Sequence, residues 1–305
     1  MQRAIVDAEF GQALEAMRAG KEQFAAARQR LVTFAETYPL DERNPEVLWR
    51  LGEMLRIEEK YPEACEAYAR CVSKYPGKEA PSLAQFAIGE IYEQKTFDYE
   101  KALQAYRAVT WGSKQADAAQ RIQRLLQKRL EVHTARVFRT DEEPVLELTS
   151  RNIETVRVRV YRLDLEDYFR ATHTAGDVGR LDIEVIAADQ TWDSKVPDYV
   201  RYRETKRQVA IPFRAPGAYV VKVDDRELEA TTMVLVSDIA LITKSSRHEF
   251  FVFTQNTKEN RPEGGVKVVL SDGKKVLAEG LTQNDGVYRF RGEDLKNRDQ
   301  LAVFA

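Results

Sequence analysis

The pattern of apolar and polar residues changes its period near residue 138 of this 305-residue chain. Before that point apolar residues recur every three or four positions, as on one face of an amphipathic helix. Beyond it, apolar and polar residues alternate strictly from Val156 to Tyr161, the pattern of a half-buried strand. The polar stretch 140–144 ends in a helix-averse proline and is the predicted linker. We therefore expect helices first and strands afterwards.

The helical part contains an internal repeat of about 37 residues. Tyr38 recurs as Tyr75 and Gly52 recurs as Gly89, each 37 positions later. A small residue lets two antiparallel helices approach closely, while larger residues such as Tyr68 fill the space beside it. This pattern resembles the tetratricopeptide repeat, whose usual period is about 34 residues. Several helix pairs are expected to stack, because each pair alone buries only one face.

The two ends of the predicted array depart from the repeat. The first unit matches only in its second helix, at 24–38. After the last repeat, Ser113 is a candidate N-cap for a helix that runs to about Val132. Its apolar stripe consists of Ala119, Ile122, Leu125 and Leu126. We expect this helix to cap the stack.

Short strands separated by turn residues dominate the second half. Strands are predicted at 181–187, 208–212, 219–223, 231–236, 239–243, 249–255, 266–270, 275–279, 287–291 and 301–304. One short helix is expected at 163–170, and long surface loops are expected at 176–179 and 193–202. Asp272-Gly273 and Asp285-Gly286 are hairpin signals in the last part. This spacing favours small antiparallel sandwiches.

Several motifs in these strands resemble one known family. The segment 148–163 and the turn Ala215-Pro216-Gly217 before Tyr219 look like the first macroglobulin-like domain of bacterial alpha-2-macroglobulins. Arg261-Pro262 and the later motif Gly280-x-Thr282-x-x-Asp285-Gly286 resemble the second such domain. The resemblance covers about 165 residues. It implies an envelope or periplasmic protein related to protease inhibitors.

The expected fold class is multidomain, α then β. We predict a tetratricopeptide-like helical repeat domain with a capping helix at 1–137, a first macroglobulin-like, Ig-like sandwich at 138–237 and a second at 238–305. The chain ends on an apolar strand, which we interpret as a cut within a longer protein. Further macroglobulin-like domains are then expected after residue 305.

Composition excludes some classes of partner. The formal net charge of −2 does not steer the molecule toward nucleic acid or anionic membranes. No apolar run approaches the roughly 20 residues that a membrane-spanning helix needs. The first residues lead directly into a charged helical pattern, so no signal peptide is expected in this chain.

The sequence offers no set of catalytic or metal-binding residues. Cys65 and Cys71 lie about 240° apart around one predicted helix, and neither precedes the Glu-Gln of a thioester motif. The three histidines, His133, His173 and His248, have no triad partners at motif spacing. We expect turns or linker at Glu142-Glu143, Asp224-Asp225 and Gly264-Gly265. The prediction is therefore no enzyme, no cofactor and no metal.

A basic stripe follows the last predicted helix. It consists of Arg121, Arg124, Lys128 and Arg129, opposite the apolar stripe of that helix. A solvated helix face is the favoured interpretation, and a docking patch for an acidic partner is the alternative.

A better candidate site lies on the first helix of each repeat. In tetratricopeptide arrays the first-helix residues one turn apart line the groove that binds peptide segments. By register with Gly52 and Gly89, these residues are Trp49, Glu53, Arg56, Phe86, Glu90 and Glu93. Aromatic residues among charges are suited to anchor and orient an extended peptide. The alternative is that Trp49 and Phe86 pack against a neighbouring repeat.

Two functional hypotheses remain open. The first is a non-catalytic region of an envelope alpha-2-macroglobulin-like protein, a family of protease traps, in which the helical repeats bind a protein partner and the sandwiches form a scaffold. The second is an adaptor whose β-sandwiches are generic surface modules unrelated to protease inhibition. Further sandwich modules and a thioester beyond residue 305 would favour the first.

Overall fold

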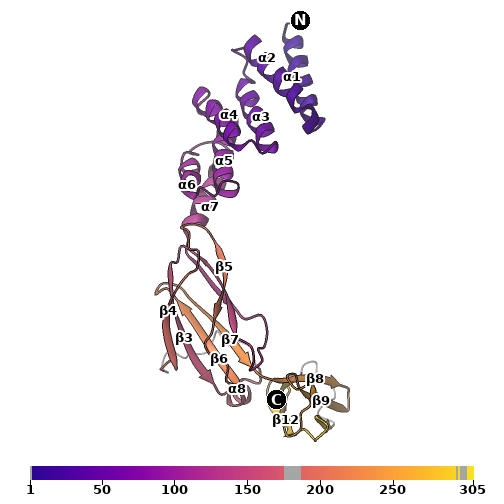
Figure 1. Cartoon of the computed structure of the whole chain (residues 1–305). Helices are drawn as coiled ribbons and strands as arrows, with labels where there is room; N and C mark the ends of the chain where they lie inside the picture. Colours follow the sequence, from indigo (N-terminus) through magenta and orange to yellow (C-terminus); the bar gives the residue numbers. More distant parts are fainter. Residues whose placement is uncertain (1, 175–186, 293–294, 296–300) are drawn as a thin grey trace. The chain divides into compact units, whose positions relative to one another are not determined.

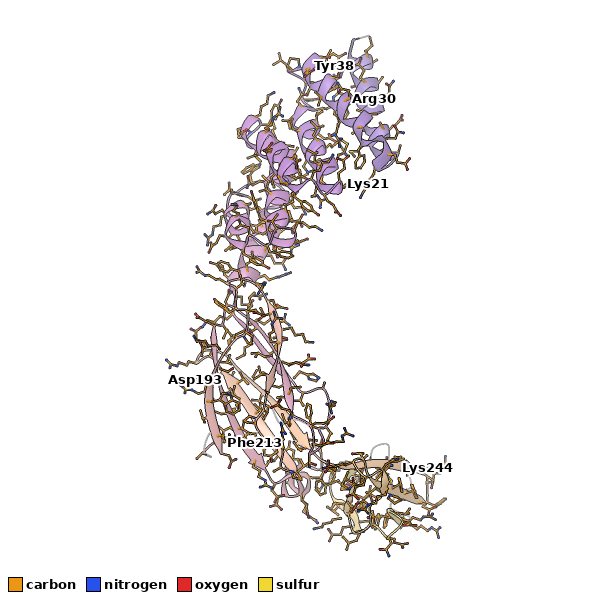
Figure 2. The ribbon with its side chains drawn as sticks, in the orientation of Figure 1. Lys21, Arg30, Tyr38, Asp193, Phe213 and Lys244 are labelled. Atoms are coloured by element: carbon orange, nitrogen blue, oxygen red, sulfur yellow. The ribbon has the colours of Figure 1, made fainter. Side chains whose placement is uncertain are left out.

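The described residues of the computed structural model form two compact units, Met1–Gln127 and Lys128–Ala305 (Figure 1). The structure describes residues 2–174, 187–292, 295 and 301–305. The first unit is helical, and the second consists mainly of antiparallel sheets (Figure 2). The predicted fold class, α followed by β, is confirmed. The predicted three-domain division at 137/138 and 237/238 stays a prediction.

The helical unit is a series of stacked hairpins. Its elements are α1 (Gln2–Arg18), η1 (Lys21–Gln23), α2 (Phe24–Thr37), α3 (Asn44–Ile57), α4 (Tyr61–Lys74), α5 (Glu79–Gln94), α6 (Tyr99–Arg107) and α7 (Gln115–Leu126). Helix α3 packs on α4, α4 on α5, and α5 on both α3 and α6. The first helices of successive repeats are therefore neighbours, as expected for a tetratricopeptide array. The predicted helix at 24–38 is confirmed as α2.

A tyrosine ring lies directly on a glycine in each of the two complete repeats. A Cβ atom added at Gly52 would lie 2.5 Å from Cδ1 of Tyr68, and one added at Gly89 would lie 2.5 Å from Cδ1 of Tyr106. The two rings are 0% and 1% exposed, so they have no free space into which to move. The glycines set the distance between the two helices of each hairpin.

The predicted capping helix is shorter than expected. Helix α7 begins at Gln115 with Lys114 as its N-cap, and it ends at Leu126. Ser113 instead donates its backbone N–H to the Glu79 carboxylate, 3.2 Å away. The buried stripe includes Ala118 and Leu125, while Leu126 is 44% exposed. The expectation of one helix from Ser113 to Val132 is therefore wrong.

Residues beyond α7 join the first β-sandwich. Strand β1 (Arg129–His133) pairs antiparallel with β2 (Val145–Arg151), with Val132 opposite Leu148. Leu130 is buried and Val132 packs on the sandwich core, whereas Glu131 between them is exposed. This alternation suits a strand, and burial of its apolar side in the sandwich outweighs continuation of the helix.

The first sandwich has two sheets in the described part of the chain. Strands β1, β2 and β5 (Thr205–Ala210) form one sheet in the order β1-β2-β5. The other has the order β4-β3-β6-β7, where β4 is Gln190–Lys195, β3 is Thr155–Leu163, β6 is Gly217–Asp224 and β7 is Glu229–Val236. Valines of β3 and β6 fill the space between the sheets.

Phe138, which lies just before the predicted linker at 140–144, belongs to this core. Its ring is 2% exposed, and its backbone N–H donates to the Leu235 carbonyl at 2.9 Å. Two residues later, Thr140 donates to the Asp238 carboxylate from its N–H at 2.9 Å and from its hydroxyl at 2.6 Å. These hydrogen bonds lower the pKa of Asp238. The segment before β2 is thus held against the end of β7.

Other predictions for this half have mixed outcomes. The predicted helix at 163–170 is confirmed as α8 (Leu165–Thr172). The loop expected at 193–202 is partly wrong, because its first residues belong to β4, which pairs with β3. The strand predicted at 208–212 lies earlier, in β5. The loop at 176–179 and nearly all of the strand at 181–187 lie outside the described residues.

The last part of the chain forms a second, smaller sandwich. One sheet consists of β8 (Ile239–Ser245), β9 (Glu249–Asn256), β10 (Arg261–Pro262) and β13 (Val287–Arg291), with β9 between β8 and β13. The facing sheet has the order β12-β11-β14, where β12 is Val276–Leu281, β11 is Lys267–Ser271 and β14 is Ala302–Phe304. Phe250, Val252, Val268 and Leu270 form its core. All six strands predicted here are present, with small shifts at their ends.

We predict that Gly52→Ala destabilises the helical unit by about 1–3 kcal/mol, because the new methyl group would overlap the buried ring of Tyr68. Gly11→Ala is the matched control: it lies within α1, and an added Cβ meets nothing within 4 Å. That substitution should raise stability by up to about 1 kcal/mol through helix propensity. Urea unfolding followed by circular dichroism at 222 nm measures both. Equal effects of the two substitutions would show that Gly52 does not lie at a tight crossing.

Candidate functional site

The predicted groove residues lie on α3 and α5, where two of their carboxylates accept hydrogen bonds from buried tyrosines. The hydroxyl of Tyr68 on α4 donates to Glu53 on α3. The hydroxyl of Tyr106 on α6 donates to Glu93 on α5, with 2.7 Å between the oxygens. The ring that rests on each glycine thus carries its hydroxyl group to a first-helix carboxylate. The second helix of each hairpin therefore positions the polar groups of the first.

Arginine completes this arrangement in the first of the two repeats. Arg56, one turn after Glu53, places its Nη2 atom 2.7 Å from the Glu53 carboxylate. The hydrogen bond from Arg56 to Glu53 raises the pKa of the guanidinium group. Burial raises the pKa of Tyr68, and the negative charge of Glu53 raises it further. The tyrosine therefore stays a neutral hydrogen-bond donor.

In the second repeat the positive charge comes from another helix. Arg121 on α7 lies 3.6 Å from the Glu90 carboxylate and 3.4 Å from the Glu93 carboxylate. Arg124 lies 3.6 Å from Glu93, whose side chain is only 5% exposed. Burial also raises the pKa of Tyr106, followed by its hydrogen bond to Glu93. The capping helix thus supplies the counter-ions for a largely buried carboxylate.

The two aromatic residues of the predicted groove differ in exposure. Phe86 is 6% exposed, and its ring centroid lies 5.4 Å from that of Tyr106. Trp49 is half-buried against the core cluster of α3, α4 and α5, with the Arg50 guanidinium 5.4 Å from its ring centroid. Of the two rings, Trp49 therefore offers the larger surface to a partner.

The six predicted residues do not form one continuous cluster of hydrogen bonds. Glu53 and Arg56 contact each other, and Glu90 and Glu93 share Arg121. The sequence analysis did not assign a role to the hydroxyls of Tyr68 and Tyr106. The sequence signal for the tyrosines was present, because Tyr68 follows Gly52 by 16 residues and Tyr106 follows Gly89 by 17. The acceptor differs between the repeats, since Glu53 directly follows its glycine and Glu93 lies four residues after its own.

The predicted basic stripe is divided between a helix and a strand. Arg121 and Arg124 lie on α7, whereas Arg129 lies on β1. The ammonium group of Lys128 is 2.8 Å from Asp225 and 2.9 Å from Glu227. Arg129 pairs with Glu131 and Glu204, each at 2.8 Å. The expectation that these residues share one helix face is wrong, because α7 ends at Leu126 and Arg129 lies on β1. The four side chains stay partly exposed, and each pairs with a carboxylate.

The cysteines occupy ordinary structural positions. Cys71 is buried, its Sγ atom donates to the Pro45 carbonyl at 3.2 Å, and burial raises the pKa of its thiol to about 12. Cys65 is half-buried and also free. Within the described ranges, no group of three or more His, Cys, Asp or Glu side chains is arranged to hold a metal ion.

The remaining polar candidates have structural partners. His173 ends α8 in the left-handed region, and its Nδ1 atom lies 2.9 Å from the Ser271 hydroxyl. Glu142 accepts hydrogen bonds from Arg136 at 2.7 Å and from the Arg139 N–H, which lower its pKa to about 2. Asp225 accepts the N–H groups of Glu227 and Leu228 in the turn between β6 and β7.

These observations define a class of protein: a multidomain chain in which tetratricopeptide-like helical hairpins precede antiparallel β-sandwiches. In the described part of the chain, no helix has the length and apolar character needed to span a membrane. The polar groups at the repeat face are charged, and Glu53, Arg56 and Glu90 are partly exposed.

Comparison with known proteins identifies part of this chain. Residues 236–305 match the model of the bacterial alpha-2-macroglobulin MG3 domain. Alpha-2-macroglobulin from Ralstonia nicotianae is 36% identical over 75 residues, which are 25% of this chain and 5% of that protein. The resemblance to bacterial alpha-2-macroglobulins is therefore confirmed, and it is carried by residues 236–305. The matched domain is MG3, where the sequence motifs suggested the second macroglobulin-like domain.

Two solved structures are similar at the level of the chain trace. Native alpha-2-macroglobulin from Escherichia coli, spanning domains MG0-NIE-MG1, is 16% identical with a TM-score of 0.45, covering 58% of this chain and 64% of that chain. A tetratricopeptide repeat protein from Parabacteroides merdae is 19% identical with a TM-score of 0.30, covering 34% of this chain and 38% of that chain. The chain thus spans less than two thirds of each of these relatives.

We predict that Tyr106→Phe lowers stability by about 1–3 kcal/mol, because Glu93 would keep its burial and lose a hydrogen-bond donor. Tyr61→Phe is the control, since no hydrogen bond of the half-buried Tyr61 hydroxyl is found among the described residues. It should change stability by less than about 0.5 kcal/mol. A double-mutant cycle with Glu93→Gln, followed by urea unfolding, measures the coupling. If Tyr106→Phe costs no more than Tyr61→Phe, the hydrogen bond does not stabilise the hairpin.

Proposed function

We propose that this chain is a non-catalytic region of an envelope alpha-2-macroglobulin-like protein, in which the helical repeats bind a protein partner and the β-sandwiches form a scaffold. The match of residues 236–305 to a bacterial alpha-2-macroglobulin domain carries the proposal. An envelope or periplasmic location follows from the same kinship. Protease trapping would belong to the whole protein, of which the matched segment is a small part.

The geometry of the candidate site supports binding in preference to catalysis. General acid–base catalysis requires titratable groups in opposed environments within reach of a substrate. The carboxylates of Glu53 and Glu93 are instead paired with arginine and with neutral tyrosines. Such fixed charges orient a partner and affect its association rate more than they affect its affinity. The site is therefore proposed as a recognition surface.

Within that surface, Trp49 is the proposed apolar anchor. It lies on α3, and Glu53 and Arg56 follow it one and two turns along the same helix. Glu90 extends the surface to α5. Phe86 and Glu93 are proposed to support the site from within, because both are buried. An aromatic residue beside fixed charges is a common centre of binding energy in protein interfaces.

The second functional hypothesis, an adaptor with generic surface sandwiches, is less well supported. Only the relationship to alpha-2-macroglobulins explains why the last module matches a named domain of that family. A generic sandwich would need no such match.

The protease-trap part of the proposal is tested on the full-length natural protein. Incubated with an endopeptidase, it should block hydrolysis of casein while hydrolysis of a short peptide substrate continues, because a trap hinders only large substrates. The 305-residue chain alone should change neither rate. Unchanged casein hydrolysis with the full-length protein would favour the adaptor hypothesis. A substrate-cleaving activity of the chain that one point mutation abolishes would contradict a non-catalytic role.

The binding surface is tested by paired substitutions in the full-length protein. Trp49→Ala and Arg56→Glu should each lower the amount of any partner that co-purifies by about tenfold or more, because they remove the anchor and reverse a fixed charge. Arg70→Glu on α4 is the control, since this exposed side chain lies on a second helix. Circular dichroism must show a native helical content for all three. Equal partner recovery in folded Trp49→Ala and Arg70→Glu would place the binding surface elsewhere.

A further inference from the structure

The outer face of the sheet formed by β8, β9 and β13 carries an unusual row of apolar side chains. Along β9, Phe250, Val252 and Thr254 are buried between the two sheets. Because side chains alternate along a strand, Phe251 and Phe253 point to the opposite, outer face. Both are half-buried there. The solvent-facing side of an antiparallel sheet usually carries polar residues, so two phenylalanines stand out.

The register of the sheet extends this apolar surface across its strands. Phe253 lies opposite Ile242 of β8 on one side and Val287 of β13 on the other. Ile242 is 57% exposed. In the next row, Phe251 lies between Lys244 and Arg289. One row is therefore apolar. In the adjacent row an aromatic ring has one cation on each side.

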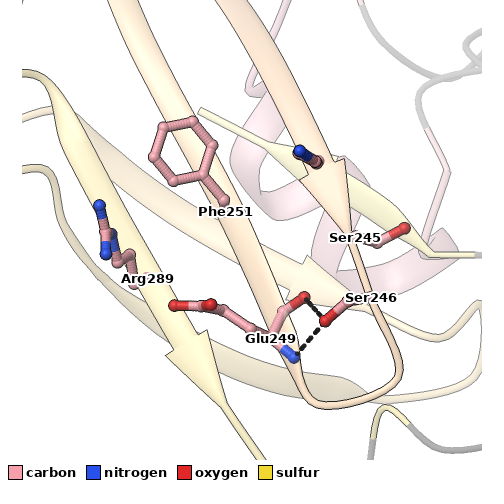
Figure 3. Close-up of a pocket in the computed structure, with 6 residues that line it drawn as sticks. Ser245, Ser246, Glu249, Phe251 and Arg289 are labelled. Atoms are coloured by element: carbon pink, nitrogen blue, oxygen red, sulfur yellow. Dashed lines mark hydrogen bonds between the residues drawn. The ribbon is translucent and has the colours of Figure 1, made fainter.

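These two cations have no carboxylate partner among the described residues. The Arg289 guanidinium lies 5.6 Å from the centroid of the Phe251 ring. Glu249 lines the same open pocket of about 290 Å³ as these two cations (Figure 3). Its carboxylate pairs with Arg291, at 3.1 Å. Lys244 is exposed on β8 (Figure 2). The surface therefore keeps an excess of positive charge beside its apolar row.

Strand β8 also has an open edge in the described part of the chain. It pairs with β9 along its whole length and with no other described strand. Beyond its end, the Ser246 N–H donates to the Glu249 carbonyl at 2.8 Å. Hydrogen-bonded pairs recur every second residue in an antiparallel ladder, so the backbone of Leu241, Thr243 and Ser245 faces away from β9. All three residues are exposed.

We propose that the edge of β8 binds an extended, acidic peptide segment of a partner protein, which adds to the sheet as a further strand. Its backbone would pair with Leu241, Thr243 and Ser245. Its outward side chains would place an acidic group beside Lys244 and an apolar group beside Ile242, because neighbouring positions on one face interact. The unpaired cations specify an acidic partner, and the open edge specifies an extended one. This surface lies on the second sandwich and is independent of the proposed helical site.

The test uses the whole 305-residue chain labelled with ¹⁵N and the capped eight-residue peptide Ser-Glu-Ser-Val-Ser-Glu-Ser-Val, in which Glu and Val alternate along one face of the extended strand. The peptide should bind saturably, shift the amide signals of β8 and slow hydrogen exchange at Leu241, Thr243 and Ser245 by at least tenfold. A peptide with Lys in place of Glu should bind at least tenfold more weakly. No saturable binding at millimolar peptide, or equal binding of both peptides, would overturn the proposal.

Three variants separate the contributions of charge and edge. Lys244→Glu with Arg289→Glu should weaken binding of the acidic peptide at least tenfold, while Lys274→Glu, an exposed change in the turn before β12, should leave it unchanged. Thr243→Pro removes an N–H that faces the open edge and should also abolish binding. Unchanged binding by the folded Thr243→Pro variant would exclude strand addition. Binding of the chain to phosphatidylglycerol vesicles without protection of these amides would assign the face to lipid and overturn the peptide proposal.

Discussion

The contact between a tyrosine ring and a glycine fixes the geometry of the helical unit. Tyr68 lies on Gly52 and Tyr106 lies on Gly89, so closely that no side chain fits at either glycine. The contact sets the spacing of each hairpin and carries a hydroxyl to a carboxylate of the neighbouring helix. Core packing and surface charge are therefore coupled, because a change in the ring would move or free the carboxylate.

This coupling explains which of the predicted groove residues are available to a partner. Glu93 and Phe86 face the interior with Tyr106, whereas Trp49 and Glu90 retain exposed surface. The repeat face thus presents a half-buried tryptophan ring beside charged side chains. The second sandwich also places an aromatic ring among charged side chains. There the strand register does so, because it brings Lys244 and Arg289 to either side of Phe251.

Much of the fold could be predicted from the sequence, because glycine spacing, strict alternation and Asp-Gly turns are local signals. The repeat pattern and the strands of the last 70 residues are examples. The end of α7 was not predictable from helical period alone, since the stripe ending at Leu125 continues smoothly into the alternation of β1, and only pairing with β2 decides between them. For the candidate site, the register placed the six residues on the first helices α3 and α5, and their role in binding stays a prediction. The register could not predict that Phe86 is buried while Trp49 is half-buried, because the burial of these rings depends on α6 and α7.

The most direct test of this account is the ionisation of the two ring-on-glycine tyrosines. Their pKa values should lie above the ordinary value of about 10, since burial and the adjacent carboxylates of Glu53 and Glu93 disfavour the phenolate. With ¹³Cζ-labelled tyrosine, and with Tyr68→Phe and Tyr106→Phe for assignment, NMR follows each ring as the pH rises. The account predicts that both signals stay at the neutral position until the helical unit unfolds. Reversible titration of both near pH 10 in the folded chain would contradict it.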